Sequence, residues 1–569
     1  MDFTHSQFGR RMLRRWVAHP LVAADRLRER AEAVAFLRDA ADPALGRLRA
    51  GLSQLVDLER GLCRIRYAQA TPPELLRILR SLSAAMALVP PGLHIADGPR
   101  ILAELLDADI WTAELRDAVH GWREQLDAVS AKAARKETLF AQGPLADELR
   151  AHQSRVEAVD AELQGHISEV RTQLGDTSLE FRSVAGADYL VDLRHSRAKH
   201  VPPDWVRVSA TKTHGRFHTP FVVANLAERE RRREALQLAA RDAYQRFLAQ
   251  IAAHYASLRR MVTSLATLDA LFSLAMLAQQ PGFCRPDVVD APAAFVDLCD
   301  AVHPVLRGAA YVPNSVRLGL PDAEDTPTAE DNPAARAMIL TGPNAGGKSS
   351  LIRTVALIAI MAQCGSYVPA SRARLAIVDA VFTRIGASDK LMAAQSTFMV
   401  EMRETADILR HVSPRSLAVI DELGRGTSTH DGAAIAFAVL AHLLHCRPLV
   451  FFVTHYAHLA EAFAANSLVR SCHMSYVELS PASANPEHSS AGAIPELAFL
   501  YKLANGASTD SFGLNVARIA GLPDSLLRCA KERAACMRTD LDSRWAARCA
   551  ALLRRSVAQA KRGSPISEA

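Results

Sequence analysis

MILTGPNAGGKSS, residues 338–350, joins an apolar run to a glycine-rich loop that ends in Lys348 and Ser349. The loop fits G-x4-G-K-[ST], a pattern in which glycines let backbone N–H groups approach phosphate oxygens while the lysine reaches the β and γ phosphates. A strand before the loop and a helix after it, ending before Gly365, favour a nucleotide-binding α/β domain over an accidental turn. We therefore expect ATP to bind at Gly342, Pro343, Asn344, Ala345, Gly346, Gly347, Lys348, Ser349 and Ser350.

A second apolar run, residues 417–420, leads directly into Asp421 and Glu422. Two acids at the end of a buried strand are costly unless a cation or hydrogen-bond donors meet them. Beside a phosphate-binding loop, Asp421 suits the shell of a Mg²⁺ ion and Glu422 suits orienting the attacking water. We expect Ser349 and Asp421 to bind the metal, with Glu422 and Lys348 as catalytic residues.

A third apolar run, residues 448–454, ends at His455. Ligands bind at the carboxyl ends of strands in open α/β sheets, so His455 could sense the γ-phosphate as a third catalytic residue. A capped loop histidine is the alternative interpretation. The polar loop GRGTSTHDG, residues 424–432, lies beside the acids, and Asp431 is the expected N-cap of a helix from about Gly432.

The segment STFMVEMRETADIL, residues 396–409, has apolar side chains at helical spacing. Phe398, Met402, Ala406 and Leu409 would share one face of this helix. Ser396 would cap its start, where a phosphate could bind. A simple helix cap is the plainer alternative, and the residues do not show whose phosphate would be bound.

The rest of the chain is mainly helical in pattern. Residues 1–165 are rich in Leu, Ala, Arg and Glu, and helical periodicity returns across about 224–280. Between these stretches, residues 188–193 and 205–208 alternate in the manner of strands, which predicts a small β-rich unit inserted between two helical arms. Strands alternating with helices further on predict a largely parallel sheet. Polar stretches at 321–335 and 480–495 are typical of loops.

Composition excludes several classes of protein. The 569 residues are 49% apolar and 22% charged, which excludes wholesale disorder and fibrous proteins. The excess of 67 Lys and Arg over 61 Asp and Glu permits nucleic-acid binding without requiring it. Nine Cys without a CxxC pair indicate neither a disulfide framework nor a zinc site, and favour a reducing compartment. Residues 1–15 lack the apolar core of a secretory signal, and the stretches 354–364 and 437–453 are too short or too interrupted for a membrane span.

Basic and aromatic side chains are interleaved between Arg194 and Phe217, within the predicted β-rich unit. Such side chains can contact phosphates and position a protein on DNA without reading its sequence. A solvated basic face explains the spacing equally well. The candidate DNA contacts are Arg207, Lys212 and Arg216.

Five blocks of the chain resemble the MutS family of DNA mismatch-repair ATPases: TGPNAGGKSS, STFMVEMRETADIL, DELGRGTSTHDG, FFVTHY and FLYKLANGASTDSFGLNVARIAGLP. The resemblance is dense from Tyr311 to Ala530. It extends upstream through FGRRMLRRWVAHPL, PPDWVRVSATKTHGRFHTPF and LATLDALFSLAMLAQQPGFCRP, so it covers nearly the whole chain. These upstream segments look most like the third eukaryotic homologue, the insertion/deletion-loop branch.

The resemblance implies a multidomain α and α/β protein. A helical lever domain with an inserted β-rich clamp would precede an ABC-type P-loop ATPase domain and a C-terminal helix-turn-helix. The implied ranges are lever arms at 1–165 and 224–285, a clamp at 166–223, the ATPase at 286–504, a helix-turn-helix dimerisation region at 505–540 and a disordered tail at 541–569. Because two subunits of this family sandwich the nucleotide, Ser396 would reach the γ-phosphate of the partner subunit. Tyr311 and Tyr501 would lie near adenine, with core packing as the alternative for both.

Two departures from the family pattern stand out. Ala345 replaces the usual methionine in the loop, and a small residue there should leave phosphate binding intact. The mismatch-reading and connector domains of the family precede the lever, whereas Met1 already lies in lever-like sequence. We expect this chain to lack both domains, through truncation or because the partner senses the mismatch.

The resulting hypothesis is a nuclear ATPase that clamps mismatched or looped DNA as half of a MutS-type heterodimer, with ATP and Mg²⁺ bound and MutL-type factors acting downstream. One alternative is a meiotic-type homologue that embraces recombination junctions. Another is a dimer partner that does not hydrolyse ATP. A transporter-type ABC engine fits poorly, because we expect no membrane segment.

Overall fold

The computed structural model describes residues 2–197, 201–306, 311–320, 332–386, 397–479, 496–508, 512–537 and 539. The chain divides into two compact units. The helical unit comprises residues 2–15 and 39–273, and the α/β unit comprises residues 16–38 and those from 274 onward. Most of α2 (Ala24–Asp39) belongs to the α/β unit, although it falls within the first arm implied by the family resemblance. The expected domain boundaries therefore stay predictions.

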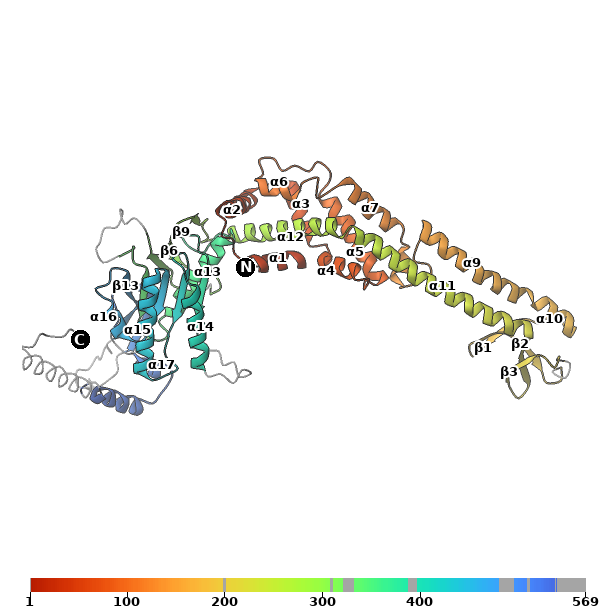
Figure 1. Cartoon of the computed structure of the whole chain (residues 1–569). Coiled ribbons are helices and arrows are strands. Elements are labelled where there is room, and N and C mark those ends of the chain that lie inside the picture. Colours follow the sequence, from red (N-terminus) through yellow and green to blue (C-terminus); the bar gives the residue numbers. More distant parts are fainter. Residues whose placement is uncertain are drawn as a thin grey trace, which may run out of the picture. The chain divides into compact units, whose positions relative to one another are not determined.

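The helical unit confirms the helical pattern expected before residue 165 and after residue 224. Capping side chains such as Asp57 and Thr112 begin several of its helices by accepting hydrogen bonds from backbone N–H groups. Two long helices, α9 and α11, lie side by side and lead into and out of a small sheet (Figure 1). The helices of this unit are α3 (Pro43–Leu52), α4 (Leu58–Arg66), α5 (Pro72–Leu88), α6 (Arg100–Leu105), α7 (Ala113–Glu124), α8 (Ala128–Lys132), α9 (Pro144–Gly165), α10 (Ile167–Leu174) and α11 (Pro220–Ala253), with α1 (Gln7–Ala18) and α12 (Tyr255–Ala278) divided between the units.

The inserted β-rich unit is a four-stranded antiparallel sheet in the order β1-β2-β4-β3. Its strands are β1 (Phe181–Val184), β2 (Ala187–Arg194), β3 (Val206–Ala210) and β4 (His214–His218). Inward-facing Val191, Leu193 and Trp205 pack against Val170 of α10 and form a small core. The alternation seen in the sequence thus coincides with β2 and the first part of β3, although β3 is exposed along its whole length.

Helix α12 is long and apolar enough to cross a membrane, a stretch that the sequence analysis did not consider. However, 83% of its most apolar window is buried in the protein, as in the core helix of a globular domain. It also carries the fully buried Asp269, whose carboxylate accepts hydrogen bonds from the backbone N–H groups of His5 and Ser6 at 2.9 and 2.8 Å. This carboxylate satisfies the N–H groups at the start of α1.

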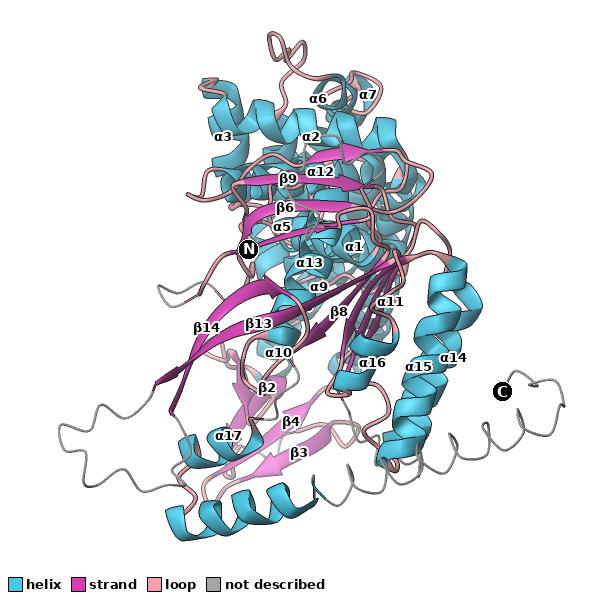
Figure 2. Cartoon of the chain, turned by 90° about the vertical axis from the view of Figure 1, so that its left-hand side faces the viewer, coloured by secondary structure: helices cyan, strands magenta, loops and turns pink. Residues whose placement is uncertain are grey.

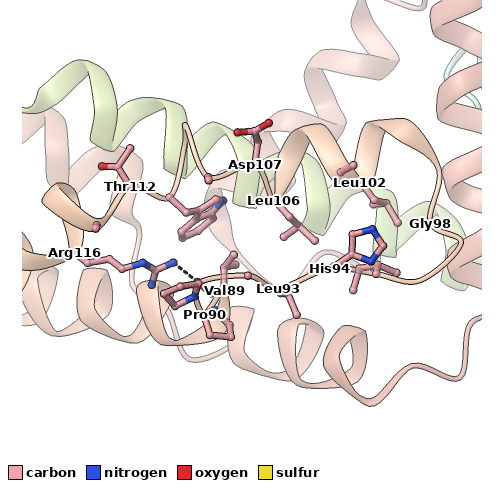
Figure 3. A pocket seen from close by; sticks show the side chains of 17 residues that line it. Val89, Pro90, Leu93, His94, Gly98, Leu102, Leu106, Asp107, Thr112 and Arg116 are labelled. Atoms are coloured by element: carbon pink, nitrogen blue, oxygen red, sulfur yellow. Dashed lines mark hydrogen bonds between the residues drawn. The ribbon is translucent and has the colours of Figure 1, made fainter.

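The helical unit also contains a cavity of 520 Å³ around α6 and α7 (Figure 3). Its lining is mainly apolar, with Leu102, Leu106 and Trp111 among its walls, and Arg116 lies at one end. The Arg116 guanidinium donates to the Met86 carbonyl at 2.5 Å and thereby satisfies part of its own hydrogen-bonding capacity. None of the predicted ATP, metal or DNA residues lines this cavity.

The α/β unit is built on a six-stranded sheet in the order β10-β11-β12-β8-β13-β14. All neighbouring strands are parallel except the final pair, which confirms the predicted largely parallel sheet. Its strands are β8 (Ala337–Thr341), β10 (Val381–Arg384), β11 (Leu417–Asp421), β12 (Leu449–Val453), β13 (Val469–Leu479) and β14 (Glu496–Asn505).

Both faces of this sheet are covered, so its central strands are apolar on both sides. Met338 and Leu340 belong to the core on one face together with α13 (Lys348–Gln363), while Ala337 and Ile339 belong to the core on the other. The second core is covered by α14 (Thr397–His411), α15 (Thr429–Cys446) and α16 (Ala457–Ala462), and α14 lies beside α15 (Figure 2). Continuous apolar runs are the expected sequence of such doubly covered strands.

A second, four-stranded sheet in the α/β unit has the order β5-β9-β6-β7 and shares the core beneath α13. Its strands are β5 (Asp287–Val289), β6 (Val296–Ala301), β7 (Asn314–Leu318) and β9 (Arg372–Ala376). Helix α17 (Gly513–Ile519) and a helical run over 524–537 end the described chain. Residues 321–331 of the loop expected at 321–335, the loop expected at 480–495 and the tail at 541–569 lie outside the described residues.

Candidate functional site

The glycine-rich loop joins β8 to α13, as the sequence predicted. Gly342 and Gly347 have φ values of +118° and +95°, and Ala345 between them takes a φ of +64°. Glycine adopts a left-handed backbone without steric strain, and the strain at Ala345 is confined to that one residue. The loop can therefore curl its backbone around an anion. The nucleotide-binding pattern is therefore present in three dimensions, with the start of α13 directly behind it.

Lys348 lies inside this curled loop and is only 4% exposed. Its Nζ donates to the carbonyl oxygens of Gly342 at 2.7 Å and Pro343 at 2.9 Å. Burial lowers the pKa of Lys348 to about 8, although the carboxylates of Glu422 and Asp421 oppose this shift. A buried ammonium held only by carbonyl groups is suited to exchange them for a phosphate.

Asp421 ends β11 at the same sheet edge, because β11, β12 and β8 are parallel and in register. Asp421 pairs with Val453, and Val453 pairs with Leu340, two residues before Gly342. Burial raises the pKa of Asp421, while the neighbouring Ser349 hydroxyl opposes the rise. The Oδ1 atom of Asp421 is buried and has no hydrogen-bond partner in the described chain. An orphaned carboxylate oxygen beside a serine hydroxyl fits an oxygen-binding cation such as Mg²⁺.

No cluster of three His, Cys, Asp or Glu side chains suited to a metal occurs in the described ranges. Mg²⁺ usually takes one or two protein ligands and completes its shell with water and phosphate oxygens. Ser349 and Asp421 are therefore a sufficient protein ligand set.

Glu422 follows Asp421 with a left-handed φ of +58°, which is strained for a residue with a side chain. Its Oε1 lies 2.6 Å from Nε2 of His455, and its Oε2 lies 2.6 Å from the Arg425 guanidinium. The His455 hydrogen bond, helped by the charge of Arg425, holds the pKa of Glu422 below its ordinary value. His455 is thus brought to Glu422 by the parallel register of β12 beside β11.

The two tyrosines contact different parts of the loop and the helix that follows it. The Tyr311 hydroxyl lies 3.1 Å from Oγ1 of Thr354 on α13. The ring edge of Tyr501 comes within 3.4 Å of the point that a Cβ on Gly347 would occupy, and Tyr501 is 40% exposed. Tyr501 therefore borders the phosphate loop, and Tyr311 is tied to the helix that follows it.

The helix predicted over 396–409 is α14, which begins at Thr397; Ser396 lies outside the described residues. Its most buried residues are Glu401, Thr405 and Ile408, rather than the predicted face of Phe398, Met402, Ala406 and Leu409. Met402 and Leu409 of the predicted face pack partly buried against the core, while the buried Glu401 lies 3.3 Å from the guanidinium of Arg384 on β10. Apolar periodicity alone could not anticipate an acid in the core.

The predicted cap of α15 was also wrong. Ser428 is the N-cap: its backbone is extended, and its Oγ accepts a hydrogen bond from the Asp431 N–H at 3.2 Å. The Ser428 hydroxyl also donates to the Asp431 carboxylate at 2.8 Å. This reciprocal pair starts the helix at Thr429, three residues before the predicted Gly432.

The three candidate DNA contacts lie in different surroundings. Arg207 on β3 and Lys212 in the β3–β4 turn are exposed. Arg216 is largely covered, and its Nε lies 3.7 Å from Oδ1 of the nearly buried Asp192. Trp205, part of the interleaved basic and aromatic segment, is buried in the core of the small sheet. The aromatic members of that segment therefore stabilise the sheet, while Arg207 and Lys212 face solvent.

Two further side chains at the site escaped the sequence analysis. Met474 of β13 backs the glycine-rich loop, lying within 3.6 Å of the points where Cβ atoms on Gly342, Gly346 and Gly347 would stand. Glu401 accepts a hydrogen bond from the backbone N–H of Gly424, just beyond Asp421 and Glu422. The available signal for Glu401 was a lone acid set among Met399, Val400 and Met402.

Comparison with known proteins agrees with this architecture. MutS domain III matches residues 1–275, and MutS domain V matches residues 338–538. The chain is 40% identical over 548 residues to "DNA mismatch repair protein msh3" of Aspergillus oryzae, covering 94% of this chain and 47% of that protein. The protein of the same name from Botryotinia fuckeliana is 39% identical over 559 residues, with coverage of 94% and 47%.

A third relative, "DNA mismatch repair protein MSH3" of Phaeosphaeria nodorum, is 40% identical over 542 residues, covering 93% of this chain and 46% of that protein. The chain thus spans about half the length of the curated relatives it matches. Both matching domains and these relatives point to one family and one of its branches. The chain therefore belongs to the MutS family, in the branch of the msh3 relatives.

Proposed function

We propose that the chain is an ATP-hydrolysing subunit of a mismatch-repair complex that clamps DNA. The observation that carries this proposal is the meeting of Lys348, Asp421, Glu422 and His455 at one edge of a parallel sheet. The relatives are named DNA mismatch repair proteins, which supports the biological setting.

The chain's own residues support a specific division of labour in ATP hydrolysis. Lys348 would release the carbonyls of Gly342 and Pro343 and hold the β and γ phosphates instead. Ser349 and Asp421 would hold Mg²⁺, which neutralises phosphate charge when bound. Glu422 has a lowered pKa and is therefore ionised at neutral pH, as needed to orient and polarise the attacking water.

His455 holds Glu422 at 2.6 Å, close to the position we propose for the γ-phosphate. From there it would orient Glu422 and register whether the phosphate is present. We further propose that Tyr501 and Tyr311 border the adenosine part of the nucleotide. Their places beside Gly347 and α13 support this assignment.

A second MutS-type subunit would complete the site through Ser396, reaching the γ-phosphate bound by the partner, as the family resemblance implies. The helical pair formed by α17 and residues 524–537, joined by a turn at Gly521 and Pro523, is a candidate helix-turn-helix for bracing that dimer. We also propose a nuclear location and MutL-type partners downstream, on the strength of the msh3 relatives.

We propose that the small sheet is a DNA clamp, with Arg207 and Lys212 contacting phosphates. Both side chains are exposed, and phosphate contacts of this kind hold DNA without reading its sequence. ATP occupancy would be linked to DNA binding by roughly 1–3 kcal/mol, with equal effect in both directions.

The central test compares Lys348→Ala and Glu422→Gln in the chain purified with its partner subunit. Lys348→Ala should abolish ATP binding, whereas Glu422→Gln should bind ATP but lose about 10²–10⁴-fold in turnover. Normal turnover in Glu422→Gln would contradict the catalytic assignment.

DNA binding is tested separately by titrating looped duplexes and four-way junctions at several salt concentrations. We expect affinity to fall steeply with salt and to favour the looped duplex. Affinity that does not respond to salt would exclude a backbone clamp, and a preference for junctions would favour the meiotic-type alternative.

A further inference from the structure

A buried carboxylate outside the nucleotide-binding motifs lies directly behind the catalytic acids. Glu401 of α14 is 3% exposed, and its Oε1 accepts a hydrogen bond from the backbone N–H of Gly424 at 2.8 Å. The same oxygen lies 3.3 Å from the guanidinium of Arg384 on β10, which is also buried. Gly424 is two residues beyond Glu422, so Glu401 holds the loop that carries the proposed catalytic base.

Gly424 is held from several sides at once. Its φ of +92° suits glycine, and a Cβ there would come within 2.6 Å of the Gly432 carbonyl oxygen at the start of α15. The Tyr456 hydroxyl donates to the Gly424 carbonyl at 3.1 Å. Both backbone hydrogen-bonding groups of Gly424 are therefore occupied, by side chains from α14 and from the segment after β12.

This anchoring matters for Glu422 because of its own backbone. A non-glycine residue at φ +58° persists only where its surroundings fix it. The fixed points on either side are the β11–β12 ladder, through the Glu422 N–H to the Val453 carbonyl at 2.9 Å, and Gly424. Losing the Gly424 anchor would let the Glu422 side chain move away from His455.

Glu401 also lies near the start of α14, so its carboxylate connects that end of the helix to the Gly424 loop. Glu401 is one turn beyond Thr397, where the helix begins, and a Cβ on Gly426 would lie 2.9 Å from the Phe398 Cβ. The Arg384 guanidinium donates to the Gly386 carbonyl at 2.5 Å. The first turn of α14 and the loop after Asp421 and Glu422 are thus packed together around a buried ion pair.

We propose that Glu401 is a positioning residue for ATP hydrolysis: it fixes the orientation of Glu422 through the Gly424 amide. Through the same bond it links the first turn of α14, the end that we propose meets the partner subunit, to that orientation. The inference rests on the proposed ATPase function. It assigns to Glu401 no contact with the nucleotide.

The test uses two double variants that differ only at residue 401, where one keeps a side-chain oxygen that can accept a hydrogen bond and the other does not. Arg384→Met with Glu401→Leu replaces the buried ion pair by apolar side chains of similar size, a change that folded proteins often tolerate. Arg384→Met with Glu401→Gln also removes the ion pair but keeps an oxygen that can accept from Gly424. Asp407→Asn, on the same helix with a side chain 69% exposed, serves as the surface control.

We expect the Leu variant to bind ATP within about twofold of the wild-type Kd, but to turn it over at least about tenfold more slowly, a loss equivalent to about 1.4 kcal/mol. The Gln variant and Asp407→Asn should keep turnover within about threefold of wild type. Hydrogen exchange of the peptide covering residues 422–428 should be faster in the Leu variant alone. This readout does not depend on catalysis.

Equal turnover in the Leu and Gln variants, with unchanged exchange of residues 422–428, would overturn the positioning role. A Leu variant that lost ATP affinity as much as turnover would also overturn it, because a loss of folding or binding would then explain the result. Wild-type protein that bound no ATP would instead refute the proposed function itself. The two failures are therefore distinguishable.

Discussion

Raising the pH from 7 to 9 should weaken ATP binding by about tenfold, because Lys348 loses its proton over this range when no nucleotide is bound. Burial lowers the pKa of Lys348 to about 8, well below its ordinary value of 10.5. Only the charged ammonium attracts phosphate strongly, and a bound triphosphate favours that form. Above pH 8, binding must therefore be coupled to proton uptake. A group with a pKa of 8 is about nine-tenths charged at pH 7 and about one-tenth charged at pH 9, which gives the tenfold factor.

The assay is a titration with a fluorescent ATP analogue at half-unit steps from pH 7 to pH 9, at constant ionic strength and saturating Mg²⁺. Phosphate groups complete their last ionisation near pH 6, so the ligand's charge is nearly constant over this range. Lys348→Arg is the control, because a guanidinium does not titrate here and its pH profile should be flat whatever its absolute affinity. A wild-type affinity that stays constant from pH 7 to pH 9 would show that Lys348 keeps its ordinary pKa, and the burial argument would be wrong.

Three further predictions follow from the site and the small sheet. His455→Ala removes the strongest influence that lowers the pKa of Glu422, so the acid limb of the pH–turnover profile should move to higher pH; an unmoved limb would contradict the pairing. Asp421→Asn should raise the Tm of the nucleotide-free protein at pH 7, because burial raises the pKa of Asp421 and penalises its ionised form, and the gain should vanish below pH 3.8, where the carboxyl is protonated in the folded and the unfolded chain. Lys212→Ala should weaken DNA binding and reduce the salt slope by about 1 without changing Tm, whereas Arg216→Ala should lower Tm because Arg216 pairs with the nearly buried Asp192; the reverse result would reverse these roles.

The central strands and their chemistry could be predicted because their signals are local. Strands β8, β11 and β12 are almost entirely apolar, since both faces of the sheet are covered, and each ends at or just before the predicted site residues. The glycine-rich loop can likewise be recognised from the sequence, because only a few residue types allow its backbone to curl. The family resemblance followed from these same blocks and is shown by the domain matches.

Several features could not be predicted because they depend on partners distant in the sequence. Glu401 is buried only because Arg384 and the Gly424 amide meet it in the fold. The Arg216 side chain turned out to be paired rather than exposed, because β2 brings Asp192 beside it. The start of α15 was misplaced for a local reason: Ser428 caps the helix, and Asp431 is its reciprocal partner within the first turn.

By itself, the sequence determined that this chain holds a parallel α/β sheet, a glycine-rich loop with a nucleotide-binding pattern, and acids and a histidine at strand ends, since each of these depends on neighbouring residues. Only the tertiary structure decided that Lys348 donates hydrogen bonds to loop carbonyls and that His455 and Arg425 both contact the Glu422 carboxylate. It also decided that the buried Glu401–Arg384 pair supports the loop after Glu422. The physical reason is that burial and strand register are set by the packing of segments far apart in the chain, and they fix both the distances between side chains and their pKa values.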